Sequence, residues 1–329
     1  MAHNLATGKD GKPAMMFTGE TPWHGLGTKL ENPATAAEAI KAAGLDWKVV
    51  MQDIRRGDKP VDGYKAVVRE DTDAVLSVMK DSYTPIQNQA AFEGIDKLVG
   101  SKQAIYHTAG ALGKGEKVWM MAKLPGDVVV KGTDGDKIEK FLLLSNSHDG
   151  SQALRIFFTP VRVVCQNTLN AALGKAGREG VAIRHTVNAE SRFEEARKIL
   201  GISLKFYDDF EARVNRFREV KMNAKLLEAY INEVMPVKED AKRKTRALNN
   251  RGEIERLFTE GKGQDIAGVK GTLWAALNSV TEFASYYKGT RGSNDDERKS
   301  NRLESVWFGS AAELNRRAWS AAEAFAGIV

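Results

Sequence analysis

Three side chains that could perform acid–base or nucleophilic chemistry lie in the middle of the chain. His148 and Asp149 belong to the polar segment SNSHDGS at residues 145–151, and Cys165 ends an apolar run. Histidine titrates near neutral pH, and a cysteine becomes a nucleophile when a base lowers the pKa of its thiol. The competing interpretation is structural, because Asn, Asp, Ser and Gly form tight turns and a lone cysteine packs as a small apolar residue.

Positive charge gathers in two stretches of the chain. Residues 150–189 contain one acid, Glu179, and residues 241–251 contain none. Clustered cations attract a polyanion, although a basic run is also typical of an ordinary solvated surface. Polar residues after the strand near Val164 are expected to begin a helix, whose free backbone N–H groups could hold a phosphate. The residues that we expect to contact nucleic acid are Arg155, Arg162, Gln166, Asn167, Thr168, Lys175, Arg178, Arg184, Lys242, Arg243, Lys244 and Arg246.

Composition excludes several classes of protein. The chain has 329 residues, a formal charge of +6 and a single cysteine, which rules out an internal disulfide and a cysteine-rich zinc site. No apolar run approaches the roughly 18–20 residues of a membrane span, and the N-terminus lacks a signal-peptide pattern. The histidines have no metal-ligand spacing. We therefore expect a cytoplasmic protein that needs no metal and no cofactor.

The elements that must position these residues indicate an α+β protein. Strands are expected at residues 47–54, 64–69, 74–79, 104–108, 117–124, 127–131, 137–144, 154–164 and 181–186. Helices are expected at 34–44, 89–99, 168–173, 191–235, 272–287 and 303–325. The predicted organisation is a flexible arm (1–20), a core domain with an antiparallel-rich sheet and packed helices (21–189), and an all-helical C-terminal region (190–329).

Four motifs in order resemble a known family. They are TPWHGLG at 21–27, SNSHDGS at 145–151, VRVVCQNTL at 161–169 and RHT at 184–186. Together with GTLW at 271–274 they are similar to the laterally transferred phage/plasmid-like protein family, which has a domain of unknown function. The resemblance implies a gene of phages and plasmids, and it supplies no catalytic residues. The layout also loosely resembles the single-strand annealing proteins of the RecT and Red-beta kind, by analogy of fold alone.

The leading hypothesis is a DNA-handling protein that binds single-stranded DNA and promotes annealing or recombination. Cations would neutralise phosphates and aromatic rings would stack on bases. Such a protein is not an enzyme, and it is expected to form a homo-oligomeric ring or filament, away from membranes. Two alternatives stay open: a hydrolase or nucleotide-modifying enzyme that uses His148, Asp149 and Cys165, and a host-defence inhibitor that binds a protein.

Overall fold

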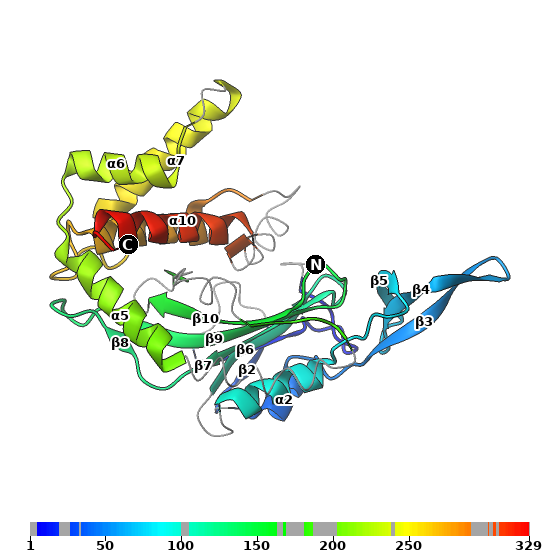
Figure 1. Cartoon of the computed structure of the whole chain (residues 1–329). Helices are drawn as coiled ribbons and strands as arrows, with labels where there is room; N and C mark the ends of the chain where they lie inside the picture. The colour runs from blue at the N-terminus through cyan, green and yellow to red at the C-terminus, as the bar shows by residue number, and fades with distance from the viewer. Residues whose placement is uncertain are drawn as a thin grey trace. The chain divides into compact units, whose positions relative to one another are not determined.

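The computed structural model describes residues 5–19, 27–32, 34–99, 105–162, 167–168, 181–186, 203–237, 241–290, 302, 305–306 and 309–328. The chain divides into two compact units. Unit 1 contains residues 1–125, 141–158 and 179–203, and unit 2 contains residues 126–140, 159–178 and 204–329. The chain passes between the units several times, and two of these passages, after Lys140 and after Phe158, fall within strands. The α+β prediction is confirmed (Figure 1).

The main sheet has the strand order β11-β10-β9-β7-β6-β1-β2, with β12 beside β10 and β8 beside β9. Its strands are β1 (Met15–Thr18), β2 (Thr28–Leu30), β6 (Ile105–Leu112), β7 (Lys117–Lys123), β8 (Val128–Val129), β9 (Lys137–Ser147), β10 (Leu154–Arg162), β11 (Asn167–Thr168) and β12 (Val181–Ile183). β1 and β2 pair in parallel. The other pairs of this sheet for which the residue register is described are antiparallel.

Two helices, α1 (Ala36–Ala42) and α2 (Asn88–Val99), cover one face of the sheet in unit 1 (Figure 1). Ala39 and Ile40 of α1 and Phe92 and Ile95 of α2 are buried in a common apolar core with the inward residues of the strands. Thr35 begins α1 through a capping box, in which its hydroxyl accepts from the backbone N–H of the third helical residue.

The predicted flexible arm is wrong for part of its length. Strand β1 pairs with β6, and Leu5, Ala6 and Met16 are buried. A short apolar stretch of this kind lacks the alternation that marks a strand, and pairing with a distant strand decides its conformation.

Strands β3 (Val49–Arg56), β4 (Lys59–Arg69) and β5 (Ala74–Lys80) form a separate antiparallel sheet, which confirms the predicted hairpin. At its base, Arg69 is buried, and its guanidinium pairs with Asp71 at 2.6 Å. The same guanidinium donates to the carbonyl of Lys114 at 2.9 Å and lies 4.6 Å from the ring centre of Trp47. A buried cation is tolerated here because its donors are satisfied.

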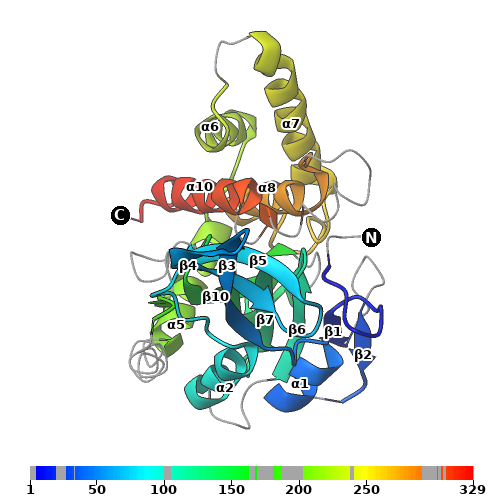
Figure 2. The ribbon, with the colours of Figure 1, turned by 90° about the vertical axis from the view of Figure 1, so that its right-hand side faces the viewer.

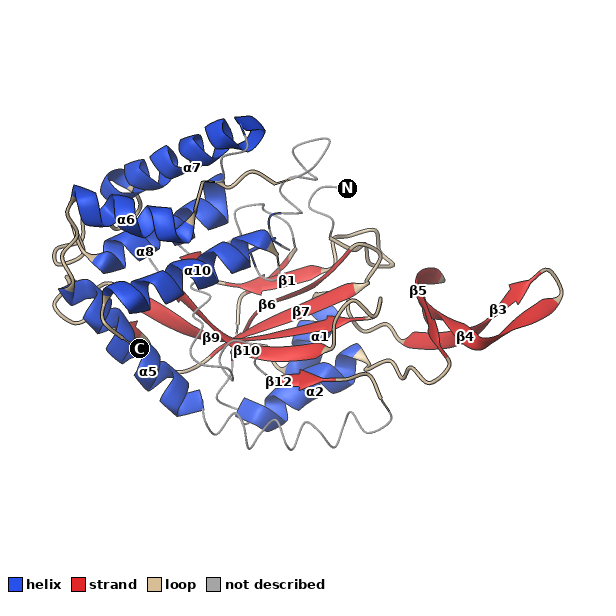
Figure 3. Cartoon of the chain, turned by 45° about the horizontal axis from the view of Figure 1, so that its top comes forward, coloured by secondary structure: helices blue, strands red, loops and turns tan. Residues whose placement is uncertain are grey.

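Unit 2 is built mainly from helices (Figures 2 and 3): α5 (Ser203–Glu219, which begins at the unit boundary), α6 (Ala224–Val234), α7 (Ala241–Glu260), α8 (Leu273–Glu282) and α10 (Ser310–Phe325). Helix α10 touches both α8 and α6. Trp319 of α10 stacks on Phe210 of α5 at 5.2 Å between ring centres, which ties these two helices together. The prediction of an all-helical C-terminal region at 190–329 fits in part, because the compact unit that contains these helices also includes strands β8 and β11 from before residue 190.

Helix α8 continues into a π-helical turn, η2 (Phe283–Tyr287). The turn closes with the N–H of Lys288 donating to the carbonyl of Phe283 at 2.7 Å. Such turns are rare and often lie at functional sites, because they shift the direction of the side chains that follow. In this chain the residue that directly follows the turn is Lys288.

Candidate nucleic-acid interface and buried polar cluster

Arg155 of β10 and Arg184, which directly follows the end of β12, lie near each other on the outer face of this pair of strands. Arg155 is opposite Ala182 in the antiparallel register, and Arg184 follows two residues later. Diagonal neighbours of this kind are about 7–8 Å apart. Both arginines are exposed, whereas Leu154 and Ile183 on the inner face are buried. Two predicted cations, 29 residues apart in the sequence, are therefore brought together on one surface.

An aromatic residue shares the outer face with this arginine pair. Phe157 is two residues from Arg155 along β10, so strand alternation places its half-buried side chain on the same face. Phe158 points the other way and packs against the core. A ring beside two guanidinium groups is the combination that stacks a base and neutralises its phosphates.

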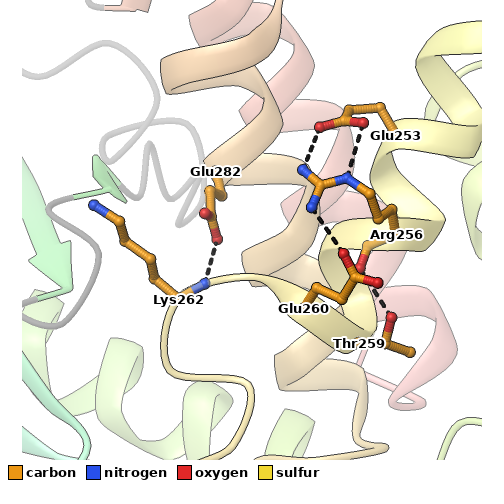
Figure 4. Close-up of polar contacts among 6 residues, drawn as sticks. All are labelled: Glu253, Arg256, Thr259, Glu260, Lys262 and Glu282. Carbon is orange, nitrogen blue, oxygen red and sulfur yellow. Dashed lines mark hydrogen bonds and ion pairs between the residues drawn. The ribbon is translucent and has the colours of Figure 1, made fainter.

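The second basic run lies on α7, in unit 2. Lys244 and Arg246 are exposed near the beginning of this helix, and Lys242 and Arg243 belong to the same helix. The other end of α7 is electrostatically balanced, because Arg256 bridges Glu253 at 2.6 Å and Glu260 at 3.0 Å (Figure 4). The sequence of α7 thus concentrates its net positive charge in the N-terminal half of the helix.

The polar residues after β10 are described only in part. Asn167 and Thr168 form the short strand β11, which pairs with Val161 and Arg162. The helix that Asn167 or Thr168 is predicted to cap would begin at residues that lie outside the described part of the chain. Gln166, Lys175, Arg178 and Cys165 lie outside the described residues.

His148 is fully buried rather than lying on a solvent-exposed turn. Its Nε2 is 3.0 Å from the side-chain oxygen of Asn88, whose amide nitrogen donates to the carbonyl of Leu45. This arrangement assigns the imidazole proton to Nε2 and leaves Nδ1 as a lone pair. Nδ1 has no hydrogen-bond partner among the described residues. Burial, with a smaller effect of His185, lowers the pKa of His148 to about 3.

A second buried imidazole, His185, stacks on Tyr83 with 5.1 Å between ring centres. Its Nδ1 accepts from the backbone N–H of Ile86 at 3.3 Å and lies 2.9 Å from the Tyr83 hydroxyl. The proton of the neutral ring is therefore on Nε2, which meets no acceptor within the described part of the chain. Burial lowers the pKa of His185 to about 4. Burial, with a smaller effect of Asp149, raises the pKa of Tyr83.

Asp149 completes a turn beside these rings. One of its carboxylate oxygens accepts from the Ser147 hydroxyl at 2.5 Å and from the backbone N–H of Ser151 at 2.9 Å. Although partial burial opposes ionisation, these hydrogen bonds and Lys117 lower the pKa of Asp149. Its geometry is that of an Asx turn, as the structural interpretation of this segment predicts.

This cluster has the chemistry of a buried polar core. Both imidazoles are neutral, and the described hydroxyl within hydrogen-bond reach of one of them is that of Tyr83, whose raised pKa opposes its activation as a nucleophile. The structure also contains no group of three His, Cys, Asp or Glu residues able to hold a metal ion, as far as the described residues go. Tyr83 and Asn88 are essential to the cluster, and nothing in the sequence pairs them with histidines 102 and 60 residues away.

A cleft of about 580 Å³ lies beside α1, and none of the predicted site residues lines it. The cleft is lined by two basic residues, Lys41 and Lys48, and by two acidic residues, Asp46 and Glu93. The mixed charge does not favour a phosphate. Both lysines are exposed.

Comparison with known proteins supplies a family. No curated protein and no solved structure matches the chain. No helix in the described ranges has the length and apolar character needed to cross a membrane. A family model described as a domain of unknown function, DUF932, matches residues 75–307, and the chain therefore belongs to the DUF932 family.

Proposed function

We propose that this protein binds single-stranded DNA and promotes the annealing of complementary strands. The observation that carries the proposal is the Arg155–Arg184 pair, which lies exposed on the outer face of β10 and β12. Two cations held by a rigid sheet can each neutralise a backbone phosphate without ordering a flexible loop. Phe157 on the same face provides a stacking surface that is indifferent to base identity.

The chemistry of the site favours a strand rather than a small substrate. Arg155 and Arg184 are exposed, although Thr159 and Val161 further along the same face of β10 are buried. The described hydroxyl that lies beside a buried histidine is that of Tyr83, whose pKa is raised by burial. We also propose that the gene originates from phages or plasmids and that the protein is related to the RecT and Red-beta annealing proteins. Annealing would require several subunits, because two strands are aligned through many phosphate contacts.

The test compares two double variants. R155A/R184A removes the pair, and K41A/K48A removes two exposed cations on the opposite, helix-covered side of unit 1. Binding of a fluorescent oligo-dT is followed by anisotropy over a range of salt concentrations. Each lost phosphate contact reduces the slope of log affinity against log salt by about 0.7, so R155A/R184A should lose about 1.4 and K41A/K48A none.

Annealing is measured on the same variants with complementary oligonucleotides. We expect R155A/R184A to anneal more slowly than the wild type, and K41A/K48A to match the wild type. Equal slopes and equal annealing rates for the two variants would contradict the proposal that Arg155 and Arg184 bind the strand.

A further inference from the structure

Three cations of unit 2 belong to elements that meet at the end of η2. Arg246 belongs to α7, Lys288 directly follows η2, and Arg317 belongs to α10. The turn η2 touches both α7 and α10. The guanidinium of Arg246 lies 3.0 Å from the position that a Cβ would take at Gly289, so it packs against the chain next to Lys288.

Lys288 reaches the beginning of α10. Its ammonium donates to the hydroxyl of Ser310 at 2.5 Å. Ser310 and Arg317 are two helical turns apart, which places them on one face of α10. The hydroxyl of Ser305 accepts from the N–H of Ala311 in the same first turn. The N-cap of α10 is Gly309, which has no capping side chain.

The charges within this group are not balanced by the described carboxylates. Burial is the main cause that lowers the pKa of Lys288, and the positive charges of Arg246 and Arg317 add to it. Glu313 lies between Ser310 and Arg317 along α10, but its carboxylate is held by Arg316 at 2.6 Å. A half-buried ammonium under the influence of two guanidinium groups costs electrostatic free energy unless an anion accompanies it.

We propose that Arg246, Lys288 and Arg317 bind a phosphate group. Ammonium and guanidinium donors, the Ser310 hydroxyl and the positive end of α10 are the groups that proteins use for this anion. A backbone phosphate of nucleic acid and the phosphate of a free ligand share this chemistry. The assignment to nucleic acid rests on the proposed function, whereas the phosphate site itself does not.

The first test uses inorganic phosphate as the probe on the full chain. Thermal unfolding is compared for the wild type, K288Q/R317Q and the control K225Q/K270Q, which removes two exposed lysines elsewhere in unit 2. At about 20 mM phosphate the midpoint of the wild type and of the control should rise by about 2 °C or more over chloride of equal ionic strength. The midpoint of K288Q/R317Q should be the same in phosphate as in chloride.

The same variants distinguish a binding role from a structural one. Without phosphate, K288Q/R317Q should unfold at the wild-type midpoint or above it, because a like-charge repulsion is removed. Positions important only for packing would lower the midpoint in both buffers. An unresponsive wild type, or a variant that responds like the wild type, would overturn the phosphate site.

Oligo-dT binding then identifies the source of the phosphate. A loss of about 1.4 in the salt slope of K288Q/R317Q assigns the site to nucleic acid. An unchanged slope, with the phosphate response still lost in the variant, assigns it to a free phosphate-bearing ligand. Failure of the phosphate site leaves the effect of R155A/R184A unaltered, so the two proposals are judged separately.

Discussion

Acidification should destabilise unit 1 through its two buried histidines. The pKa of His148 is about 3 and that of His185 about 4 in the folded protein, below the ordinary value of 6.5. A lowered pKa means that the unfolded chain binds protons first as the pH falls. The stabilising contribution is therefore complete above pH 6.5 and is lost as the pH falls toward the folded values.

The magnitude follows from the distance between pH 5 and the unfolded pKa. One pKa unit corresponds to about 1.4 kcal/mol, so each histidine should lose about 2 kcal/mol between pH 7 and pH 5. Together they should lose about 4 kcal/mol. This figure depends little on the folded pKa values, because both lie below pH 5.

The matched variant is H148Q/H185N, which cannot be protonated in this range. Glutamine retains a donor for Asn88, and asparagine retains an acceptor for the N–H of Ile86. Urea unfolding is followed by hydrogen exchange of peptides covering residues 141–147, because a signal from the whole chain would mix the two units. Peptides of α8 in unit 2 provide the internal control.

We expect the wild type to lose about 4 kcal/mol more than the variant between pH 7 and pH 5 at residues 141–147. The variant is expected to be less stable at pH 7, and that offset does not affect the comparison of slopes. Parallel pH dependence of the wild type and the variant would show that the imidazoles are not held neutral, and would refute this account of the cluster.

Three further changes test the packing. Thr35→Ala should cost about 1 kcal/mol, because α1 loses its N-cap, and circular dichroism during urea unfolding measures the loss. Gly110→Ala should cost about 1–3 kcal/mol, since its Cβ would lie 2.5 Å from a buried indole ring; exchange protection of β6 should fall, and unchanged protection would contradict the contact. Asp71→Ala should cost about 3–5 kcal/mol by leaving Arg69 buried and unpaired, whereas Asp53→Ala, at an exposed pair, should cost less than about 1 kcal/mol; equal losses would contradict the difference in burial.

Local signals in the sequence were sufficient for many elements. The alanine-rich segment after Pro33 predicts α1, and the alternating segments on either side of residues 70–73 predict the β4–β5 hairpin. Each of these depends on residues close together in the chain. Strand β1 escapes prediction because its partner, β6, lies about 90 residues away and only that pairing decides its conformation.

The sites show the same division between local and distant information. Alternation in β12 predicts that Arg184 points to solvent, but only the register places it beside Arg155. His148 is a candidate from its residue type, whereas its burial follows from the packing of Asn88 and neighbouring residues. Arg246 packs against the chain next to Lys288, directly after a π-helical turn, and no local sequence pattern predicts such a turn.

The most direct measurement is the salt dependence of single-strand binding by the full-length chain. If four to six phosphates are neutralised per subunit, log affinity should fall against log salt with a slope of about −3 to −4. R155A/R184A should bring that slope closer to zero by about 1.4, because two phosphate contacts disappear. A wild-type affinity that does not change with salt, or no retention of oligo-dT even at low salt, would contradict the proposal that this protein binds a nucleic-acid strand.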